Sequence, residues 1–561
     1  MTVGRSPLEP EAHFDAVVVG SGFGGSVTAF RLSEAGMSVC VLERGKAYPP
    51  GSFPRSPWEM GKNFWDPSEG LQGIFDVWSF RGIGAVVASG LGGGSLLWSN
   101  VVLRKDRSTF VREEGEYWPV TYDDLEPHYE RHERMMDARP YPYTSAPYDR
   151  TYKTRAMEYA SGRLGIEWFL PPLAVAFDPG DGVPRPGEPI QAEENLHGRT
   201  RLTCLLCGEC NIGCNYGAKN TLDFNYLSEA KLRHGAELRT RCEVKTFAPR
   251  PEGGFTIRYV DHSEAAEGEK RDRPLPIHTL TADRLILAAG TLGTTYLLLK
   301  NEKAFPGLSK RLGSHFCGNG DLLTIAKKAR ENGRPRIVDP GYGPVITSTM
   351  RIPDAAEGGE GRGYYIQDGG HPQIVNWIVE ASYQLNVFRK GLRLLVRLVK
   401  KWLRLDRRSD IGREMAAFWG PGVLTSSSMP LFSMGRDMPD GNMSLTDDGY
   451  LDLDWNRRSS TTFFEHLRGT SQQIANVLEA KFVDSPGWFV SRLATVHPLG
   501  GCPMGRDETE GVVDSYGNVF GYPGLVIADG SVLPGPVGPN PSTTIAALAH
   551  RFAEQTIAEA R

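Results

Sequence analysis

AVVVGSGFGGSVTAFRLSEAGMSVCVLE, residues 16–43, decides the fold. A short β-branched run leads through a glycine-rich turn into a segment of helical composition, and a second apolar run then ends in Glu43. A strand, a G-x-G-x-x-G turn, a helix, a strand and an acid about twenty residues further on form the fingerprint of a dinucleotide-binding βαβ unit. We therefore expect an α/β fold with a Rossmann-type lobe.

The glycines of this turn have separate physical roles. Gly20 permits the tight turn, and Gly22 lets the backbone approach a pyrophosphate at the N-terminus of the helix. Gly25 lets the helix pack closely on the strand. Glu43 can accept hydrogen bonds from a ribose 2′-hydroxyl and would repel a 2′-phosphate, so the pattern disfavours NADP.

The rest of the chain predicts two lobes built from separated segments, because 561 residues are too many for one ordinary core. Two further patterns of a strand followed by a turn, at 284–293 and 525–530, belong with the first strand. Residues 331–485 alternate polar and apolar positions, which is typical of an antiparallel sheet. We expect a dinucleotide-binding lobe from 10–115, 200–330 and 486–561, and an α+β substrate lobe with a mostly antiparallel sheet from 116–199 and 331–485.

Composition narrows the function classes. The net charge is −4, which argues against nucleic acid as a partner. The first residues lack the basic and apolar pattern of a secretion signal, and no run of 18 uncharged apolar residues occurs. These features predict a cytoplasmic protein.

Several motifs resemble one family in their order along the chain. They are the N-terminal FDAVVVGSGFGGSVTAFRLSEAG, the loop GLGGGSLL (90–97), LAAGTLGT, and HPLGGCPMG followed by VIADGSVLPGPVGPNPSTTIAALA. Together they resemble the glucose–methanol–choline oxidoreductases, and NYGAKNTLDFNYL (215–227) favours the cholesterol oxidase branch. The resemblance implies an FAD-dependent enzyme that oxidises an alcohol.

The resemblance also implies residue roles. Gly20, Gly22, Gly25 and Glu43 would hold the ADP half of FAD, and Val244 would contact adenine. The loop of Gly92, Gly93, Gly94 and Ser95 would lie against the flavin and its diphosphate, and Asp529 and Gly530 would hold ribityl and phosphate oxygens. The other expected FAD-binding positions are Phe23, Gly24, Arg44, Trp98, Ala289, Gly290, Asn540, Ser542 and Thr543. Trp98 is a departure, because the cholesterol oxidases carry Asn near this point.

The catalytic pair implied by the resemblance is His497 and Asn540. Oxidation of an alcohol needs a group that takes the hydroxyl proton, and a histidine suits this because its pKa lies near neutrality. An asparagine amide can hold the same oxygen without adding a charge. Glu380 is the candidate for the carboxylate base of cholesterol oxidases, or else an ordinary salt-bridged glutamate.

Four cysteines, Cys204, Cys207, Cys210 and Cys214, have the spacing of a ferredoxin cluster loop. Some flavin-dependent sugar dehydrogenases of the same broad family carry an iron–sulfur cluster in a similar segment. Zinc is an alternative, since thiolates also bind it tetrahedrally. Free or paired thiols are the third interpretation.

Residues 387–408 form a basic amphipathic pattern, with leucines and Trp402 on one helical face and arginines and lysines on the other. Such a helix suits a membrane interface, and would place the enzyme at the inner membrane surface. The alternative is an ordinary helix on the surface of the substrate lobe.

The sequence thus predicts an FAD-dependent oxidoreductase that acts on a lipophilic, sterol-like alcohol and passes electrons to oxygen or another acceptor. One alternative is a dehydrogenase that sends electrons through an iron–sulfur cluster to a quinone or a protein. Another is a membrane-associated flavin-binding protein without redox turnover.

Overall fold

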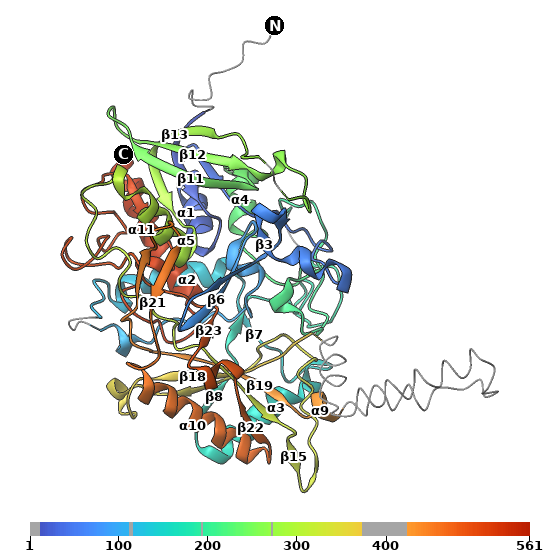
Figure 1. Ribbon diagram of the computed structural model, residues 1–561. Coiled ribbons are helices and arrows are strands. Elements are labelled where there is room, and N and C mark those ends of the chain that lie inside the picture. The colour runs from blue at the N-terminus through green and yellow to red at the C-terminus, as the bar shows by residue number, and fades with distance from the viewer. Residues whose placement is uncertain (1–11, 112–115, 192–193, 271–272, 373–422) are drawn as a thin grey trace, which may run out of the picture.

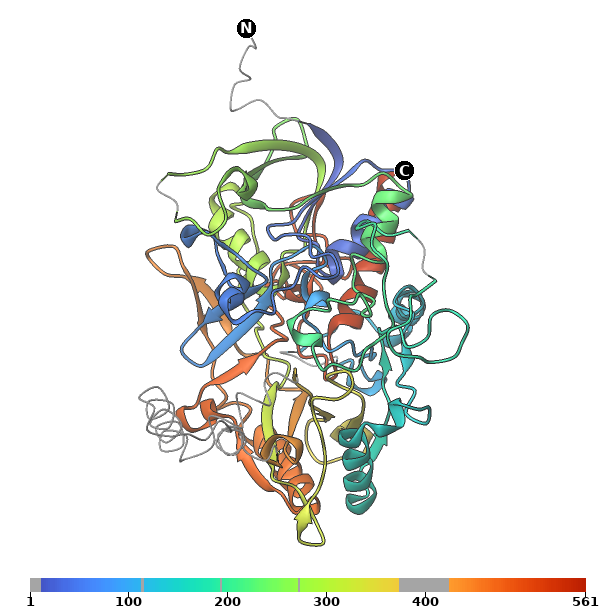
Figure 2. The same cartoon turned by 90° about the vertical axis from the view of Figure 1, so that its right-hand side faces the viewer.

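The computed structural model describes residues 12–111, 116–191, 194–270, 273–372 and 423–561. Figure 1 shows two lobes, one above the other, with the C-terminus in the upper lobe. The view turned by 90° shows the same division, with the helices α3 (Tyr152–Leu164) and α10 (Thr461–Val477) at the lower end (Figure 2).

The upper lobe contains a seven-stranded sheet built around β1 (His13–Val19). β1 pairs in parallel with β2 (Val39–Leu42) on one side and with β13 (His278–Leu287) on the other. Ala16–Val19 are buried, as expected of a β-branched run covered on both faces. The remaining strands are β10 (Glu237–Arg239) beside β2, the antiparallel β12 (Phe255–Asp261) and β11 (Cys242–Pro249), and β24 (Leu525–Ile527) beside β13.

Helices pack around this sheet. α1 (Phe23–Glu34) crosses between β1 and β2 and lies against α11 (Ser542–Ala560) and α4 (Tyr226–Leu232). α11 also contacts α2 (Tyr122–Met135), which begins at a capping box between Thr121 and Asp124. α2 lies in the segment that the sequence assigned to the other lobe, but its apolar side chains are part of the core of the upper lobe. α5 (Gly290–Asn301) follows β13.

The lower lobe contains a six-stranded, fully antiparallel sheet. α10 packs against it with Phe463, Phe464, Leu467 and Ile474, which recur at helical spacing on its buried face. β14 belongs to this sheet, so the sheet includes residues that the sequence assigned to the first lobe. In spatial order the strands are β22 (Lys481–Asp484), β14 (Leu322–Lys327), β19 (Met429–Gly435), β18 (Tyr364–Asp368), β17 (Thr349–Ile352) and β8 (Glu167–Phe169).

A smaller sheet of three strands lies near the middle of the molecule. β6 (Ile83–Ala88) pairs with β5 (Phe75–Ser79) and, in parallel, with β23 (Leu493–Thr495). The short elements that remain are β3 (Trp65–Asp66) with β4 (Leu71–Gln72), β7 (Arg139–Pro140) with β9 (Pro172–Leu173), β15 (Arg330–Glu331) with β16 (Arg334–Pro335), β20 (Asn442–Leu445) with β21 (Leu451–Asp454), and α9 (Val423–Ser426).

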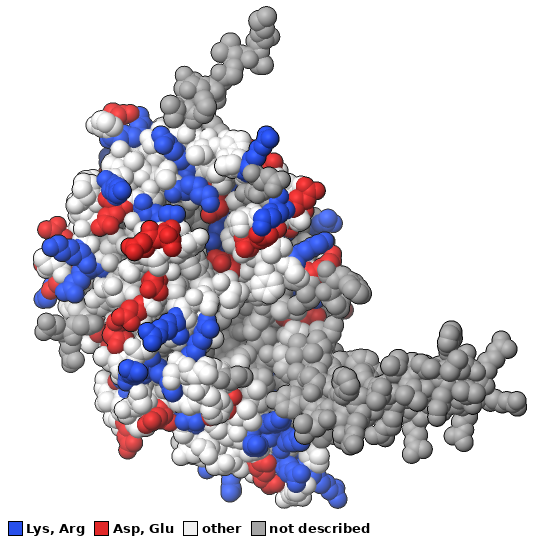
Figure 3. Space-filling model, viewed as in Figure 1, with Lys and Arg blue, Asp and Glu red and all other residues white. Residues whose placement is uncertain are grey.

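The predicted fold class is confirmed: a Rossmann-type lobe assembled from discontinuous segments, and an α+β lobe with an antiparallel sheet. In the described part of the chain, no helix is both long and apolar enough to cross a membrane. Figure 3 shows acidic and basic side chains interspersed over the face in view, without a field of one sign. Glu380 and residues 387–408 lie outside the described residues.

Candidate active site

The first glycine turn lies at the carboxyl ends of the parallel strands, where open α/β sheets bind ligands. Gly20 has a φ of +96°, and a Cβ atom there would lie 2.3 Å from the carbonyl oxygen of Ala288. A Cβ at Gly24 would lie 1.4 Å from the carbonyl oxygen of Ala528, and one at Gly25 would lie 2.1 Å from that of Gly20. These glycines therefore let α1 begin directly on the ends of β1, β13 and β24.

The second glycine loop packs against the first. A Cβ at Gly93 would lie 2.6 Å from the Cα of Gly22, and the amide of Gly92 donates to the Ser21 hydroxyl at 3.0 Å. Gly22 and Gly94, by contrast, have no atom within 4 Å of their Cβ positions. The two turns thus meet at their backbones and leave open space on one side.

Glu43 holds these turns together. Its buried carboxylate accepts hydrogen bonds from the Ser21 amide at 3.0 Å, the Ser21 hydroxyl at 2.6 Å and the Gly45 amide at 2.8 Å. The start of β11 lies beside it, since the Cys242 amide donates to the Glu43 carbonyl, and Val244 is buried two residues further on. Contacts of Glu43 with a ribose and of Val244 with adenine stay predictions. Arg44 pairs with Asp76 at 2.6 Å.

Asp529 joins two other predicted positions. One of its oxygens accepts from the Gly290 amide at 2.9 Å and from the Thr294 hydroxyl at 2.5 Å, and the other accepts from the amide and hydroxyl of Ser531. Burial raises the pKa of this carboxyl above its usual value. Asp529 therefore positions the turn of Ala289 and Gly290 at the start of α5.

His497 follows β23 and has a carboxylate partner that the sequence did not indicate. Its Nδ1 lies 2.7 Å from Oδ1 of Asp321. The other Asp321 oxygen accepts from the Thr495 hydroxyl at 2.8 Å and from the Val496 amide at 2.9 Å. Because Asp321 takes Nδ1, the imidazole is oriented so that Nε2 is the atom that can meet a substrate.

Asn540 lies just before α11 and receives a hydrogen bond from the other lobe. Its Oδ1 accepts from Nε2 of Gln367 at 3.0 Å, and Gln367 is fully buried in β18. With Oδ1 occupied, the Nδ2 amide of Asn540 is the group left to donate to a substrate oxygen.

A short segment, residues 317–321, connects the two catalytic loops. Cys317 exchanges backbone hydrogen bonds with Leu499, two residues after His497. Asn319, at a φ of 52°, donates to the Pro539 carbonyl at 3.0 Å and accepts from the amides of residues 537 and 538. The structure therefore ties the His497 loop and the Asn540 loop to the same segment, which ends at Asp321.

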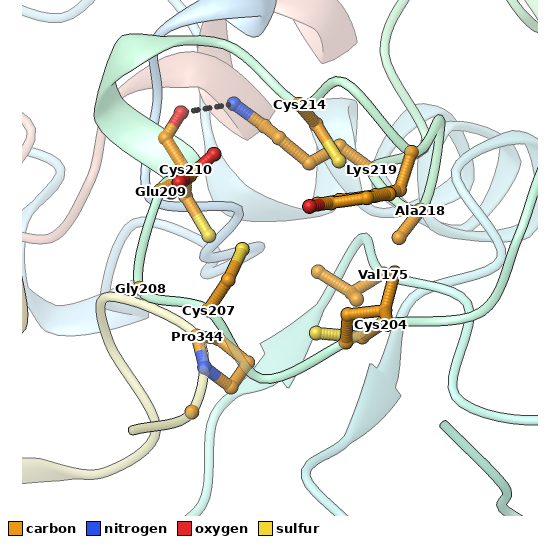
Figure 4. Close-up of a pocket in the computed structure, with 13 residues that line it drawn as sticks. Val175, Cys204, Cys207, Gly208, Glu209, Cys210, Cys214, Ala218, Lys219 and Pro344 are labelled. Carbon is orange, nitrogen blue, oxygen red and sulfur yellow. Dashed lines mark hydrogen bonds between the residues drawn. The ribbon is translucent and has the colours of Figure 1, made fainter. Parts of the chain in front are cut away.

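The four clustered cysteines line one pocket. Figure 4 shows their sulfur atoms pointing toward a common space. All eight cysteines of the chain are free thiols. Among the described residues, no group of three His, Cys, Asp or Glu side chains is arranged to hold a metal ion, so the geometry supports neither the iron–sulfur nor the zinc interpretation.

Comparison with known proteins agrees with this arrangement. Two family models, both described as GMC oxidoreductase, match residues 14–317 and 438–549. The chain belongs to the glucose–methanol–choline (GMC) oxidoreductases. A cholesterol oxidase of Mycobacterium tuberculosis (strain CDC 1551 / Oshkosh) is 31% identical over 96% of this chain and 90% of its own length.

A further relative and a solved structure of the same fold are also similar to the chain. A cholesterol oxidase of Acinetobacter baumannii is 27% identical over 96% of this chain and 93% of its own length. The crystal structure of pyridoxine 4-oxidase from Mesorbium loti has a TM-score of 0.57 and 15% identity, and the match covers 96% of this chain and 98% of that one. This GMC enzyme is an FAD-dependent alcohol oxidase or dehydrogenase.

The residues at the carboxyl edge fit FAD. Gly22, Gly94 and Gly290 leave open space where a side chain would project, as a close approach to a diphosphate requires. Buried polar atoms at the predicted FAD positions have no hydrogen-bond partner within the protein: Nε1 of Trp98, Oγ of Ser542 and Oγ1 of Thr543. Buried polar groups are normally satisfied, so these atoms are consistent with a polar ligand.

Sequence reasoning missed several residues of this site. Asp321 contacts His497, which lies 176 positions away, and Gln367 contacts Asn540, which lies 173 positions away. No local motif therefore marks either residue. Asn100 is also buried, with both amide atoms unsatisfied and a φ of 69°, two residues after Trp98. The signal that could have found Asn100 is its place in the sequence, close to the point where the cholesterol oxidases carry an asparagine.

Proposed function

We propose that this GMC enzyme oxidises the CH–OH group of a lipophilic, sterol-like alcohol to a carbonyl. The observation that supports this most directly is that His497 and Asn540 each have a buried or half-buried partner, Asp321 and Gln367. FAD, held by the residues of the two glycine turns, would supply the acceptor for the hydride of the carbinol carbon.

The protein's own residues would handle the proton and the oxygen. Nε2 of His497 accepts the hydroxyl proton, and Asp321 stabilises the imidazolium that forms. Nδ2 of Asn540 donates to the same oxygen and holds the alcohol in one orientation. General acid–base help of this kind contributes about 10²–10⁴-fold to turnover.

The sterol-like substrate is supported by the relatives, which are named as cholesterol oxidases. The test is reduction of the bound flavin under anaerobic conditions by cholesterol, a long-chain primary alcohol and glucose, each followed at the visible flavin bands. We expect cholesterol to bleach the flavin fastest. Bleaching by glucose but not by cholesterol would overturn the substrate class while leaving alcohol oxidation intact.

The electron acceptor has two candidates. Oxygen is the acceptor that the oxidase names of the relatives suggest. The sequence spacing of the four cysteines suggests a second candidate, a dehydrogenase that passes electrons through an iron–sulfur cluster to a quinone or protein. Hydrogen peroxide formed per substrate oxidised separates them: about one equivalent supports an oxidase, and none supports a dehydrogenase.

We also propose contact with the inner membrane surface, on the sequence of residues 387–408 alone. Basic residues near an anionic surface contribute about 1 kcal/mol each, less at high salt. Replacing Arg393, Arg397, Lys400 and Lys401 by Glu should abolish binding to anionic vesicles and spare oxidation of a soluble alcohol. Unchanged co-sedimentation with vesicles would remove this proposal.

A further inference from the structure

The segment that carries Asn540 has few backbone donors of its own. Residues 533–541 read LPGPVGPNP, and they form neither a helix nor a strand although every one of them is buried. Proline has no backbone N–H, so the four prolines of this segment, the proline loop, cannot donate to neighbouring carbonyl groups. The carbonyl oxygens of the proline loop therefore need donors from elsewhere in the chain.

Two buried side chains supply these donors. Nδ2 of Asn319 donates to the Pro539 carbonyl at 3.0 Å, as described above. Nζ of Lys105 donates to the carbonyl of Pro536 at 3.1 Å and to that of Val537 at 3.4 Å. Lys105 lies 431 positions before Pro536, so the amino end of the chain holds a loop close to its carboxyl end.

We propose that Lys105 is a positioning residue for Asn540: its Nζ holds residues 536 and 537 of the proline loop and thereby places the Asn540 amide at the substrate hydroxyl. This role depends on the proposed function of Asn540 in alcohol oxidation. Lys105 acts through the backbone, because its amino group is directed to two carbonyl oxygens that lie four and three positions before Asn540.

The surroundings of Lys105 fit an amino group. The side chain is fully buried. Its Nζ lies 4.5 Å from the centre of the Trp118 ring and 5.5 Å from that of Phe110, and ring faces attract a cation most strongly where water is excluded. A methionine here would fill similar space without the cost of removing a charge from water. What the lysine supplies in addition is N–H donors for the two carbonyls.

The donors of Lys105 do not depend on its charge. Burial lowers the pKa of Lys105 to about 7, and the guanidinium groups of Arg436 and Arg362 act in the same direction. The carboxylates of Glu116 and Asp106 oppose this shift in pKa. An ammonium has three N–H groups and a neutral amine has two, and two carbonyls need two. Lys105 can therefore hold the proline loop throughout the pH range in which a histidine base works.

An ion-pair network encloses the same loop. Glu116 pairs with Arg436 at 3.2 Å, and Arg436 pairs with Asp354 at 2.6 Å. A Cβ atom at Gly535 would lie 2.6 Å from Cγ of Glu116, and one at Gly538 would lie 3.8 Å from Cγ of Arg436. Packing against the network thus holds the two glycines, and the lysine holds the two carbonyls between them.

A double-mutant cycle tests whether Lys105 acts through Asn540. The variants are Lys105→Met, Asn540→Ala and the two combined, and Met removes the N–H donors while keeping a side chain of similar length. The rate is anaerobic bleaching of the bound flavin by whichever of cholesterol, a long-chain primary alcohol and glucose reduces the unchanged enzyme fastest. We expect Lys105→Met to slow bleaching about tenfold in the unchanged background and less than about twofold in the Asn540→Ala background, as for residues of one hydrogen-bond network.

The cycle separates the two ways of failing. A lysine that only stabilises the fold would lower the rate by the same factor in both backgrounds, and that result would overturn the proposal while leaving the role of Asn540 intact. An Asn540→Ala variant as fast as the unchanged enzyme would remove Asn540 from the mechanism, and the role of Lys105 with it.

Two further variants accompany the cycle, with FAD content and thermal unfolding measured for each. Lys105→Gln keeps an N–H donor on a side chain one bond shorter and should recover part of the rate. Lys300→Met removes an exposed lysine that also meets a ring and an oxygen, those of Tyr296, and should change neither rate nor FAD content. A Lys105→Gln variant as slow as Lys105→Met, or loss of folding in both, would make Lys105 a structural residue and overturn the proposal.

Discussion

Nδ1 of His497 lies 2.7 Å from Oδ1 of Asp321, 176 residues earlier in the chain. The side chains of both residues are largely buried, with 18% and 10% exposed. A carboxylate in this position fixes the orientation of the ring and the nitrogen that carries the proton. Asp321 is therefore a positioning residue for His497.

Asp321→Asn tests this relationship. The amide keeps the shape of the side chain but no longer stabilises the imidazolium, so we expect kcat to fall by about 10²-fold, at the lower end of general acid–base effects. The exposed Asp454→Asn is the control, with kcat unchanged. An unaltered kcat in Asp321→Asn would leave the residue a structural part of the loop.

His497→Ala removes the proposed base itself. We expect turnover to fall by about 10²–10⁴-fold, while the FAD content stays near that of the unchanged enzyme, because His497 is not among the residues expected to hold the cofactor. Steady-state turnover and the ratio of FAD to protein are the two measurements. Turnover close to normal would take His497 out of the mechanism.

Gly22→Ala separates cofactor binding from folding. Both Gly22 and Gly162 have open space at the Cβ position and need no left-handed backbone. At Gly22 that space is the open side of the two glycine turns, where the diphosphate should lie, so a methyl group should lower the FAD content severalfold in folded protein. Gly162→Ala, in α3, should keep full FAD content. Equal FAD content in both variants would place the cofactor away from this turn.

The local parts of this site could be predicted from sequence. Gly20, Gly22 and Glu43 lie within one βαβ unit, whose hydrophobic pattern and glycine spacing determine their positions. Partners from distant segments could not be predicted. Asp321 meets His497, and Gln367 meets Asn540, only because two sheets from separate parts of the chain come together.

The structure also shows contacts of predicted residues that the sequence did not indicate. Glu43 was expected to face a ribose, and its oxygens also accept hydrogen bonds from Ser21 and Gly45. β14 begins directly after Asp321 and pairs with β19. The residues after Asp321 therefore belong to the six-stranded sheet of the lower lobe. Local patterns describe single elements, whereas sheet membership depends on pairing across hundreds of residues.

The last prediction concerns Asp437, which is fully buried beside the catalytic segment and accepts from the amides of Gly318 at 2.9 Å and Gly320 at 3.0 Å. Burial raises the pKa of Asp437 to about 7. The folded protein therefore holds this proton more tightly than the unfolded chain, whose aspartates titrate near pH 3.9. The stabilising contribution of Asp437 is greatest below about pH 4 and is lost as the pH rises to about 7.

Asp437→Asn stays neutral at every pH, so it should lack this loss. The amide has one oxygen for two backbone donors, which costs about 1 kcal/mol at all pH values. Relative to the unchanged enzyme, the free energy of unfolding of the variant should therefore rise by a few kcal/mol at most between pH 5 and pH 8. Urea unfolding at each pH measures this, with the exposed Asp440→Asn as control. A difference that is constant across this range would mean that Asp437 is already ionised at pH 5, held by its two backbone donors.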